Sequence, residues 1–162
     1  MIANYHTHTW RCMHATGTER EYIENAIRGG LKILGFSDHT PMKYPGGYES
    51  KAKMRPDLLN FIGDEQIYDQ WMRKLCLSAK EMNIPLEINF LGIRDKRNYP
   101  NSRFWKIAGE VGNRVVFGAD AHQPEVVWNP ETISVAENMV RKYHLNLVET
   151  IEFKHTDRLN RK

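Results

Sequence analysis

Three histidines lie close together near the start of the chain, at His6, His8 and His14. His6 and His8 are two residues apart, so on an extended strand both imidazoles point to the same face, where one ion can bind both. A single histidine more often fills a half-buried polar niche. Three histidines in such a short stretch at a strand end favour a metal site over that structural role.

Two further polar pairs follow apolar runs elsewhere in the chain. Asp120 and His122 come after the apolar run 115–118, and Asp38 and His39 come after another apolar run. Asp38 and His39 are adjacent, so on an extended strand they face opposite ways and only one of them can join a common site directly. We therefore expect three strand ends to bring imidazoles and a carboxylate together.

The composition excludes several classes of protein. The chain has 162 residues, of which 41% are apolar, and this is enough for one domain with a sizeable core. The chain has 23 Lys and Arg residues against 20 Asp and Glu residues. This small excess gives no strong case for binding nucleic acid or an acidic membrane surface. No signal peptide is visible, and no apolar run approaches the roughly 18 residues of a membrane span.

The two cysteines, Cys12 and Cys76, are isolated in the sequence. They form neither a disulfide framework nor a thiolate zinc knot. A reducing compartment fits this pattern, and we expect a cytoplasmic protein.

Helical signals alternate with strand signals along the first half of the chain. A capping box of Thr18 and Glu21 opens a predicted helix that ends at Gly29-Gly30, before a predicted buried strand over 31–36. A long loop is expected over 40–60, where glycines and prolines are frequent. A second helix is predicted to begin at Asp64 with an apolar stripe of Ile67, Trp71, Leu75 and Ala79, in which Trp71 and Met72 are expected in the core.

The second half continues the alternation. A short strand is predicted over 86–89, then a helix from Ser102 as N-cap to Gly112, and a last helix with Asn129 as N-cap and Pro130 at its first position. Strand propensity returns over 145–153. Glu87, on the short strand, is a candidate metal ligand, but a structural role is favoured for it.

The pattern predicts an α/β fold of the barrel type, in which active sites gather at the C-terminal ends of parallel strands. A complete barrel of this kind takes about 250 residues. The chain is too short for one, so an incomplete barrel is expected.

The motifs resemble those of the PHP (polymerase and histidinol phosphatase) family, and within it the monofunctional histidinol-phosphatases. The resemblance is carried by the segments HTHT, CMHATG, FSDHTPM, LEIN with GIR, YPNSRF and FGADAH. It implies a partial, distorted TIM-like β/α barrel forming a single domain over 1–162, with an N-terminal part over 1–59 and a C-terminal part over 60–162. It also selects His39 over Asp38 as the site residue.

The resemblance implies two groups of metal ligands. One group is His6, His8 and Asp120, which would also be the catalytic residues, and the other is His14, His39 and His122. Three-ligand groups leave a coordination position open, as catalytic zinc sites do. Imidazole and carboxylate ligands do not discriminate sharply among zinc, manganese and iron.

One part of the family pattern has no counterpart here. The family also uses a bridging glutamate and two further histidines from central strands, and no motif in this sequence matches them. Residues 54–59 resemble the family segment after the second motif, whereas residues 60–64 resemble a later family segment. The missing part would therefore fall at the junction between these two stretches. This suggests an internal deletion of the central strands.

The implied activity is hydrolysis of L-histidinol phosphate, a small phosphate ester, by a metal-activated hydroxide. Arg94 and Arg11 are candidates to bind the substrate phosphate, since a guanidinium offers it a bidentate fork, with a structural role for each equally favoured. The alternative is a catalytically impaired remnant that binds one or two metals. A homodimer that covers the open strand edges is a further expectation.

Overall fold

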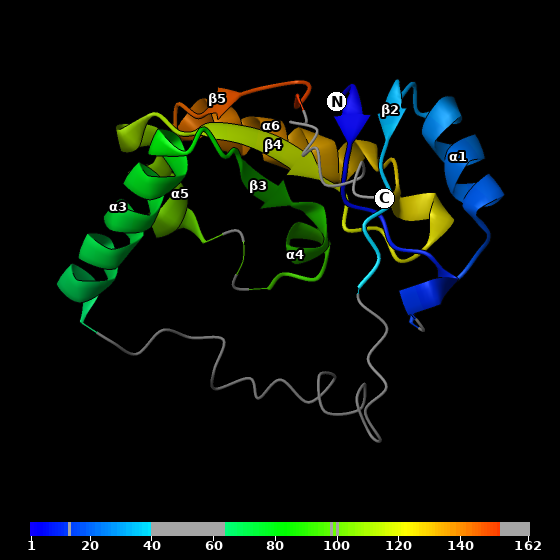
Figure 1. Cartoon of the computed structure of the whole chain (residues 1–162), viewed down its shortest axis with the longest axis horizontal. Coiled ribbons are helices and arrows are strands. Elements are labelled where there is room, and N and C mark those ends of the chain that lie inside the picture. The colour runs from blue at the N-terminus through cyan, green and yellow to red at the C-terminus, as the bar shows by residue number, and fades with distance from the viewer. Residues whose placement is uncertain (13, 40–63, 98, 100, 153–162) are drawn as a thin grey trace, which may run out of the picture.

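The computed structural model describes residues 1–12, 14–39, 64–97, 99 and 101–152. Helices and parallel strands alternate through these residues, with α3 and α5 at one end of the molecule and α1 and β2 at the other (Figure 1). In chain order the elements are β1 (Ala3–Asn4), η1 (Trp10–Cys12), α1 (Glu19–Arg28), β2 (Ile33–Leu34), α3 (Glu65–Glu81), β3 (Leu86–Asn89), α4 (Phe90–Arg94), α5 (Ser102–Val111), β4 (Arg114–Gly118), η3 (Pro124–Val126), α6 (Pro130–Lys142) and β5 (Asn146–Leu147).

The described strands form two parallel sheets. β1 pairs with β2, and β4 lies between β3 and β5. An isolated parallel bridge between Thr7 and Ala121 links the segments that follow β1 and β4. The predicted α/β class with parallel sheets is therefore correct. Within the described residues these strands do not close into a barrel, because β2 and β3 are each the edge strand of their sheet.

The strand β2 is shorter and more exposed than the sequence predicts. Only Ile33 and Leu34 pair with β1, and the side chains of Ile33 and Phe36 are 38% and 40% exposed. The prediction of a buried strand over 31–36 is wrong for these positions. The physical reason is that β2 lies at the edge of its sheet, with β1 as its one partner among the described strands.

Helix α1 begins and ends where the sequence places it. Thr18 and Glu21 form the predicted capping box, and Gly29 caps the C-terminus. The buried face carries Tyr22 and Ala26, which belong to the hydrophobic core. The capping box satisfies backbone donors that the first turn of any helix leaves unpaired.

Helix α3 begins after Asp64, whose side chain caps it as predicted, but its buried face differs from the prediction. Trp71 is 60% exposed, so its assignment to the core is wrong, whereas Met72 does pack against the core. The face that packs on α5 carries Met72, Cys76 and Ala79, spaced four and three residues apart. The buried face is thus shifted by one residue from the predicted one, and most of the predicted apolar stripe, with Ile67, Trp71 and Leu75, is exposed.

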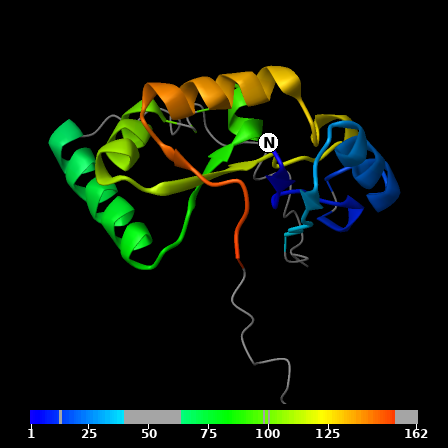
Figure 2. The ribbon, with the colours of Figure 1, turned by 90° about the horizontal axis from the view of Figure 1, so that it is seen from above.

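The core is built around β4, whose Val115 and Phe117 are buried. Helix α6 runs alongside β4 on one side of the sheet (Figure 2) and contributes Ile133 and Ala136 to the core. Asn129 and Pro130 begin α6 as predicted.

Predicted boundaries in the second half of the chain differ from the observed ones by different amounts. The N-cap of α5 is Asn101, one residue before the predicted Ser102, while Gly112 ends the helix as expected. Of the strand predicted over 145–153, only Asn146–Leu147 forms within the described residues. The loop predicted over 40–60 and the junction over 54–64 lie outside the described residues, except for Asp64 itself.

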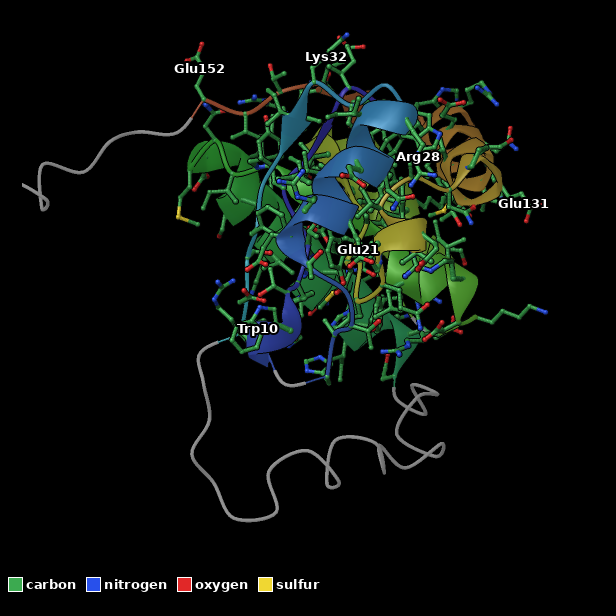
Figure 3. The ribbon with its side chains drawn as sticks, turned by 90° about the vertical axis from the view of Figure 1, so that its right-hand side faces the viewer. Trp10, Glu21, Arg28, Lys32, Glu131 and Glu152 are labelled. Atoms are coloured by element: carbon green, nitrogen blue, oxygen red, sulfur yellow. The ribbon has the colours of Figure 1, made fainter. Side chains whose placement is uncertain are left out.

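Within each of the two described sheets the paired strands run parallel to one another. Figure 3 shows Lys32, which precedes β2, at one end of the molecule and Trp10, which follows β1, at the other. The bridge between Thr7 and Ala121 places the segment after β4 beside the segment after β1, which leads to Trp10. Among the described helices, none has the length and apolar character needed to span a bilayer.

Candidate metal centre

His6, His8 and Asp120 converge at the C-terminal ends of β1 and β4, and we call them the first ligand set. The Nε2 atoms of His6 and His8 lie 3.0 Å apart. Oδ1 of Asp120 lies 3.0 Å from Nε2 of His8 and 3.4 Å from Nε2 of His6. Two imidazole nitrogens and a carboxylate oxygen thus point at one another, the arrangement that a divalent ion can bind.

A buried backbone network brings the two ends of the chain together. The amide of His8 donates to the carbonyl of Ala121 at 2.9 Å. The side-chain oxygen of Asn4 accepts from the amides of His6 and Ala119, at 3.1 and 3.0 Å. Asn4 is fully buried, so this network fixes β1 against the end of β4. It explains how residues more than a hundred positions apart share one site.

Asp120 occupies a strained backbone position. Its φ is +46°, in the left-handed region that non-glycine residues rarely adopt. Such strain persists where the surrounding structure holds it, and it is frequent at binding sites. Here the neighbouring Ala119 and Ala121 are both fully buried, and they anchor the turn that presents the Asp120 carboxylate.

His14, His39 and His122 form a second ligand set, with ligand atoms within 4.8 Å of one another. Nδ1 of His14 lies 2.7 Å from the carbonyl of Cys12, and Nδ1 of His122 lies 3.1 Å from the carbonyl of Asp120. Because a carbonyl only accepts, each Nδ1 carries the proton and each Nε2 keeps its lone pair. Both rings therefore present Nε2 for metal binding.

Asp38 and His39 have different partners in the structure. The Asp38 carboxylate accepts from the amide and the hydroxyl of Thr9, at 2.5 and 2.6 Å. His39 stacks on His8, with ring centroids 4.4 Å apart. Asp38 thus ties the segment after β2 to the segment after β1, and His39 is brought to the site.

Two buried nitrogens in the site have no hydrogen-bond partner within the part of the chain that the structure describes. They are Nδ1 of His8 and Nε2 of His122. An unpaired buried polar atom is costly and calls for an explanation such as an ion. Together with the converging donors, these atoms show that the residues present fit a metal.

The electrostatics of the site favour the protonation states that ligands need. Burial acts to raise the pKa of Asp120, but hydrogen bonds from His8 and Asn89 and the charges of His6 and His122 hold it well below its usual range. Burial lowers the pKa of His122 to about 4, with help from the charge of His8. At neutral pH Asp120 is therefore anionic and His122 neutral, as metal ligation requires.

Glu87 lies in the site without belonging to either ligand set. Its two carboxylate oxygens lie 2.8 and 3.0 Å from Nδ1 of His6. Burial acts to lower the pKa of His6, but this contact and the nearby negative charge raise it overall. A carboxylate that holds the far nitrogen of a ligand histidine fixes the orientation of the ring. The sequence favoured a structural role for Glu87, and the structure makes that role the positioning of His6.

Asn89 connects the carboxylates of the site. Its amide donates to Glu87 and to Asp120, at 3.0 Å each, while its oxygen caps α4 by accepting from the amide of Gly92. Sequence reasoning did not identify Asn89 or Asn4 as site residues. For Asn89 a signal exists in its place at the end of β3, where functional side chains of parallel sheets gather.

The two candidate arginines lie in different surroundings. Arg94, on α4, is partly buried and donates to the carbonyl of Ala119, next to Asp120. Arg11 is paired with Glu19 of α1 and its guanidinium lies over the ring of Trp10. Of the two, Arg94 is therefore the one held against the turn that carries Asp120.

Among the described residues, His144 belongs to none of the ligand groups. His144 is exposed and follows the end of α6. His155 lies outside the described residues. The exposure of His144 is typical of a surface residue.

The chain is similar to known proteins of one family. Residues 4–161 match the model of the PHP domain family. A relative from Deinococcus radiodurans, named "Probable histidinol-phosphatase", is 40% identical over 70 residues. This stretch covers 43% of the chain and 26% of the relative, so the shared part spans about a quarter of that protein. The extent of the family match establishes that the chain belongs to the PHP domain family.

Proposed function

We propose that the chain is a metal-dependent phosphoesterase of the histidinol-phosphatase type, acting on L-histidinol phosphate. The observation that carries the proposal is the presence of two three-residue ligand sets side by side, with the ring centroids of His8 and His122 4.2 Å apart. The name of the Deinococcus relative supports the choice of substrate within the phosphate esters. Zinc, manganese or iron would serve as the cofactor, because mixed imidazole and carboxylate ligands bind all three.

The residues divide into ligands and groups that orient them. His6, His8 and Asp120 would hold one ion, and His14, His39 and His122 a second. When bound, a divalent ion supplies Lewis-acid chemistry at water and at a phosphoryl oxygen. Glu87 keeps His6 oriented, with the proton on Nδ1. Asp120 stays ionised, since its pKa is held below the usual range by hydrogen bonds and nearby positive charge that outweigh its burial.

Binding of the phosphate is assigned to Arg94 in this proposal, with Arg11 as the second candidate. Arg94 lies beside the Asp120 turn, through its bond to Ala119. A guanidinium there offers charge and a bidentate fork to a phosphoryl group. Arg11 would have to leave Glu19 to take that role.

The test is release of inorganic phosphate by purified protein loaded with Mn²⁺ or Zn²⁺. We expect turnover of L-histidinol phosphate, with other phosphate monoesters as comparison substrates. His8→Ala should abolish both turnover and binding of the first ion, whereas His144→Ala, at an exposed position after the end of α6, should change neither. Absence of turnover, under conditions in which a full-length relative is active, would overturn the proposal.

A second candidate function is a metal-binding protein without catalytic activity. Glu87 is engaged by His6 and Asn89 and belongs to none of the ligand sets found among the described residues. The sequence also has no motif that matches the bridging glutamate and the two further histidines expected from the PHP family. Bound metal at a stoichiometry of one or two, without phosphate release, would favour this candidate.

We also propose that the protein forms a homodimer and resides in the cytoplasm. The described edge strands β2 and β3 are open, and apolar side chains are exposed beside β2 and on α3, among them Phe36 and Trp71. Such edges and surfaces are commonly covered by another chain. Both cysteines are free thiols, which fits a reducing compartment.

A further inference from the structure

Cys12 lies in η1, the turn that carries Trp10 in Figure 3, between the two ligand sets. Its side chain is buried and its thiol is free. The Sγ atom lies within 4.8 Å of ligand atoms of both His8 and His122. One member of each ligand set therefore faces the same sulfur.

The unpartnered nitrogens of the site belong to the same two histidines. His8 is only 1% exposed, and its Nε2 is already occupied by His6 and Asp120, so its Nδ1 is the nitrogen left over. His122 keeps Nε2 unpartnered because its Nδ1 donates to a carbonyl. Two buried nitrogens without partners beside a buried thiol form a set of donors that lacks only an ion.

We infer that Cys12, His8 and His122 form a third ligand set, the thiolate set, which binds a thiophilic divalent cation such as Zn²⁺ or Co²⁺. The inference concerns the metal centre of the proposed function and rests on it. On binding, the sulfur–metal bond forms and the thiol proton passes to solvent. One thiolate and two imidazoles leave a coordination position open.

The thiolate set would make the centre selective among metals. His122 has a single free nitrogen, so an ion in the thiolate set competes for it with an ion in the second ligand set. Thiolate favours Zn²⁺ and Co²⁺, whereas Mn²⁺ prefers oxygen and imidazole ligands. His8 has one lone pair as a neutral imidazole, so an ion in the thiolate set also takes His8 from the first ligand set. Thiophilic cations are thus drawn to the thiolate set, whereas Mn²⁺ is drawn to the first ligand set, which contains the Asp120 carboxylate.

Cys76 provides the contrast that separates this role from simple packing. Buried cysteines often act as small hydrophobic residues. Cys76 does so, since it is fully buried within the hydrophobic core, and burial raises the pKa of its thiol. Cys12 is buried too, but it lies outside that core cluster and beside imidazoles instead.

The test is titration of the full chain with Co²⁺, followed by absorption. A thiolate ligand gives an intense thiolate-to-cobalt charge-transfer band in the near ultraviolet, which nitrogen and oxygen ligands do not give. We expect this band in the native protein and in Cys76→Ser, where Cys12 is the sole thiol, and its loss in Cys12→Ser. A band that persists in Cys12→Ser, or cobalt binding without a band in the native protein, would overturn the inference.

Affinity measurements extend the same test. Loss of an outer partner of a metal ligand costs about 10–100-fold in affinity, so loss of the thiolate should weaken Zn²⁺ binding at least as much. Binding of Mn²⁺ should change far less. Equal losses for both metals would contradict the thiolate set.

X-ray absorption and a parallel assay of phosphate release complete the test. If Cys12→Ser does not fold, X-ray absorption of the zinc-loaded native protein replaces it, and a sulfur ligand at about 2.3 Å is expected. Scattering from nitrogen and oxygen alone would overturn the inference. Phosphate release by the Mn²⁺-loaded native protein is measured in parallel, so turnover without a cobalt–thiolate band refutes the thiolate set and leaves the phosphoesterase proposal standing.

Discussion

Glu87 on β3 lies directly over Gly118 on β4. A Cβ atom at residue 118 would lie 2.3 Å from Cδ of Glu87 and 2.4 and 2.7 Å from its two carboxylate oxygens. Residues of β3 and β4 pair in parallel, with Asn89 opposite Gly118, so the glycine leaves the space in which the Glu87 carboxylate reaches His6. The orientation of a candidate metal ligand therefore depends on the absence of a side chain on the next strand.

The first prediction concerns Gly118→Ala. The added methyl group would displace the end of the Glu87 side chain, and His6 would lose the partner of its Nδ1. We expect metal affinity to fall by about 10–100-fold, the range for loss of such a partner. The measurement is competition with a chelator of known affinity.

A double-mutant cycle separates this effect from a general loss of structure. In a Glu87→Ala background the displaced side chain is already gone, so Gly118→Ala should then change metal affinity little. Additive losses in the two variants would show that the glycine acts by another route.

The second prediction concerns Glu87→Gln. The amide keeps the shape of the side chain but removes its negative charge, which, with the hydrogen bond to Glu87, raises the pKa of His6 despite burial. We expect weaker metal binding and a lowered pKa of His6, measured by NMR titration of the imidazole in metal-free protein. Glu131→Gln, an exposed position at the start of α6 (Figure 3), is the matched control and should change neither quantity.

The third prediction concerns the pH dependence of stability in metal-free protein. Burial lowers the pKa of His122 to about 4 from an ordinary value of 6.5. The unfolded chain therefore binds more protons between these values, and the free energy of unfolding should fall as the pH drops from 6.5 toward 4, by at most about 3 kcal/mol. Urea unfolding at several pH values in the presence of a chelator measures it.

His6 and Asp120, the two site neighbours of His122 with shifted pKa values, contribute outside this interval. The pKa of His6 is raised, so its contribution is full at low pH and is lost as the pH rises through the folded value. Asp120 begins to lose its contribution only below the ordinary value of 3.8. His122→Gln should flatten the dependence between 6.5 and 4, and an unchanged slope would assign it to other groups.

The fourth prediction concerns the proposed homodimer. Ile67, Trp71 and Leu75 form an exposed apolar stripe on α3, each at least half exposed. Trp71→Glu should shift the protein toward monomer, because it places a charge in the centre of that stripe. Light scattering at micromolar concentration measures the mass. Gln70→Glu adds the same charge beside the stripe and should leave the mass unchanged, and a native protein that is already monomeric would refute the dimer.

The sequence determined much of the local structure. The capping box at Thr18, the Asp64 cap and the pair of Asn129 and Pro130 all begin helices where they were predicted, because capping depends on a few neighbouring residues. The six candidate ligands could also be named from spacing and family resemblance. In the structure their ligand atoms form two groups of three, and the atoms of each group lie within 4.8 Å of one another.

Only the tertiary structure decided which faces are buried and which residues support the site. Trp71 is exposed because α3 presents Met72, Cys76 and Ala79 to α5, and periodicity alone cannot choose between two overlapping apolar stripes. Glu87, Asn89 and Asn4 act through partners distant in the chain, across the junction of β1, β3 and β4. Local sequence carries no record of such contacts, since they exist only once the strands lie side by side.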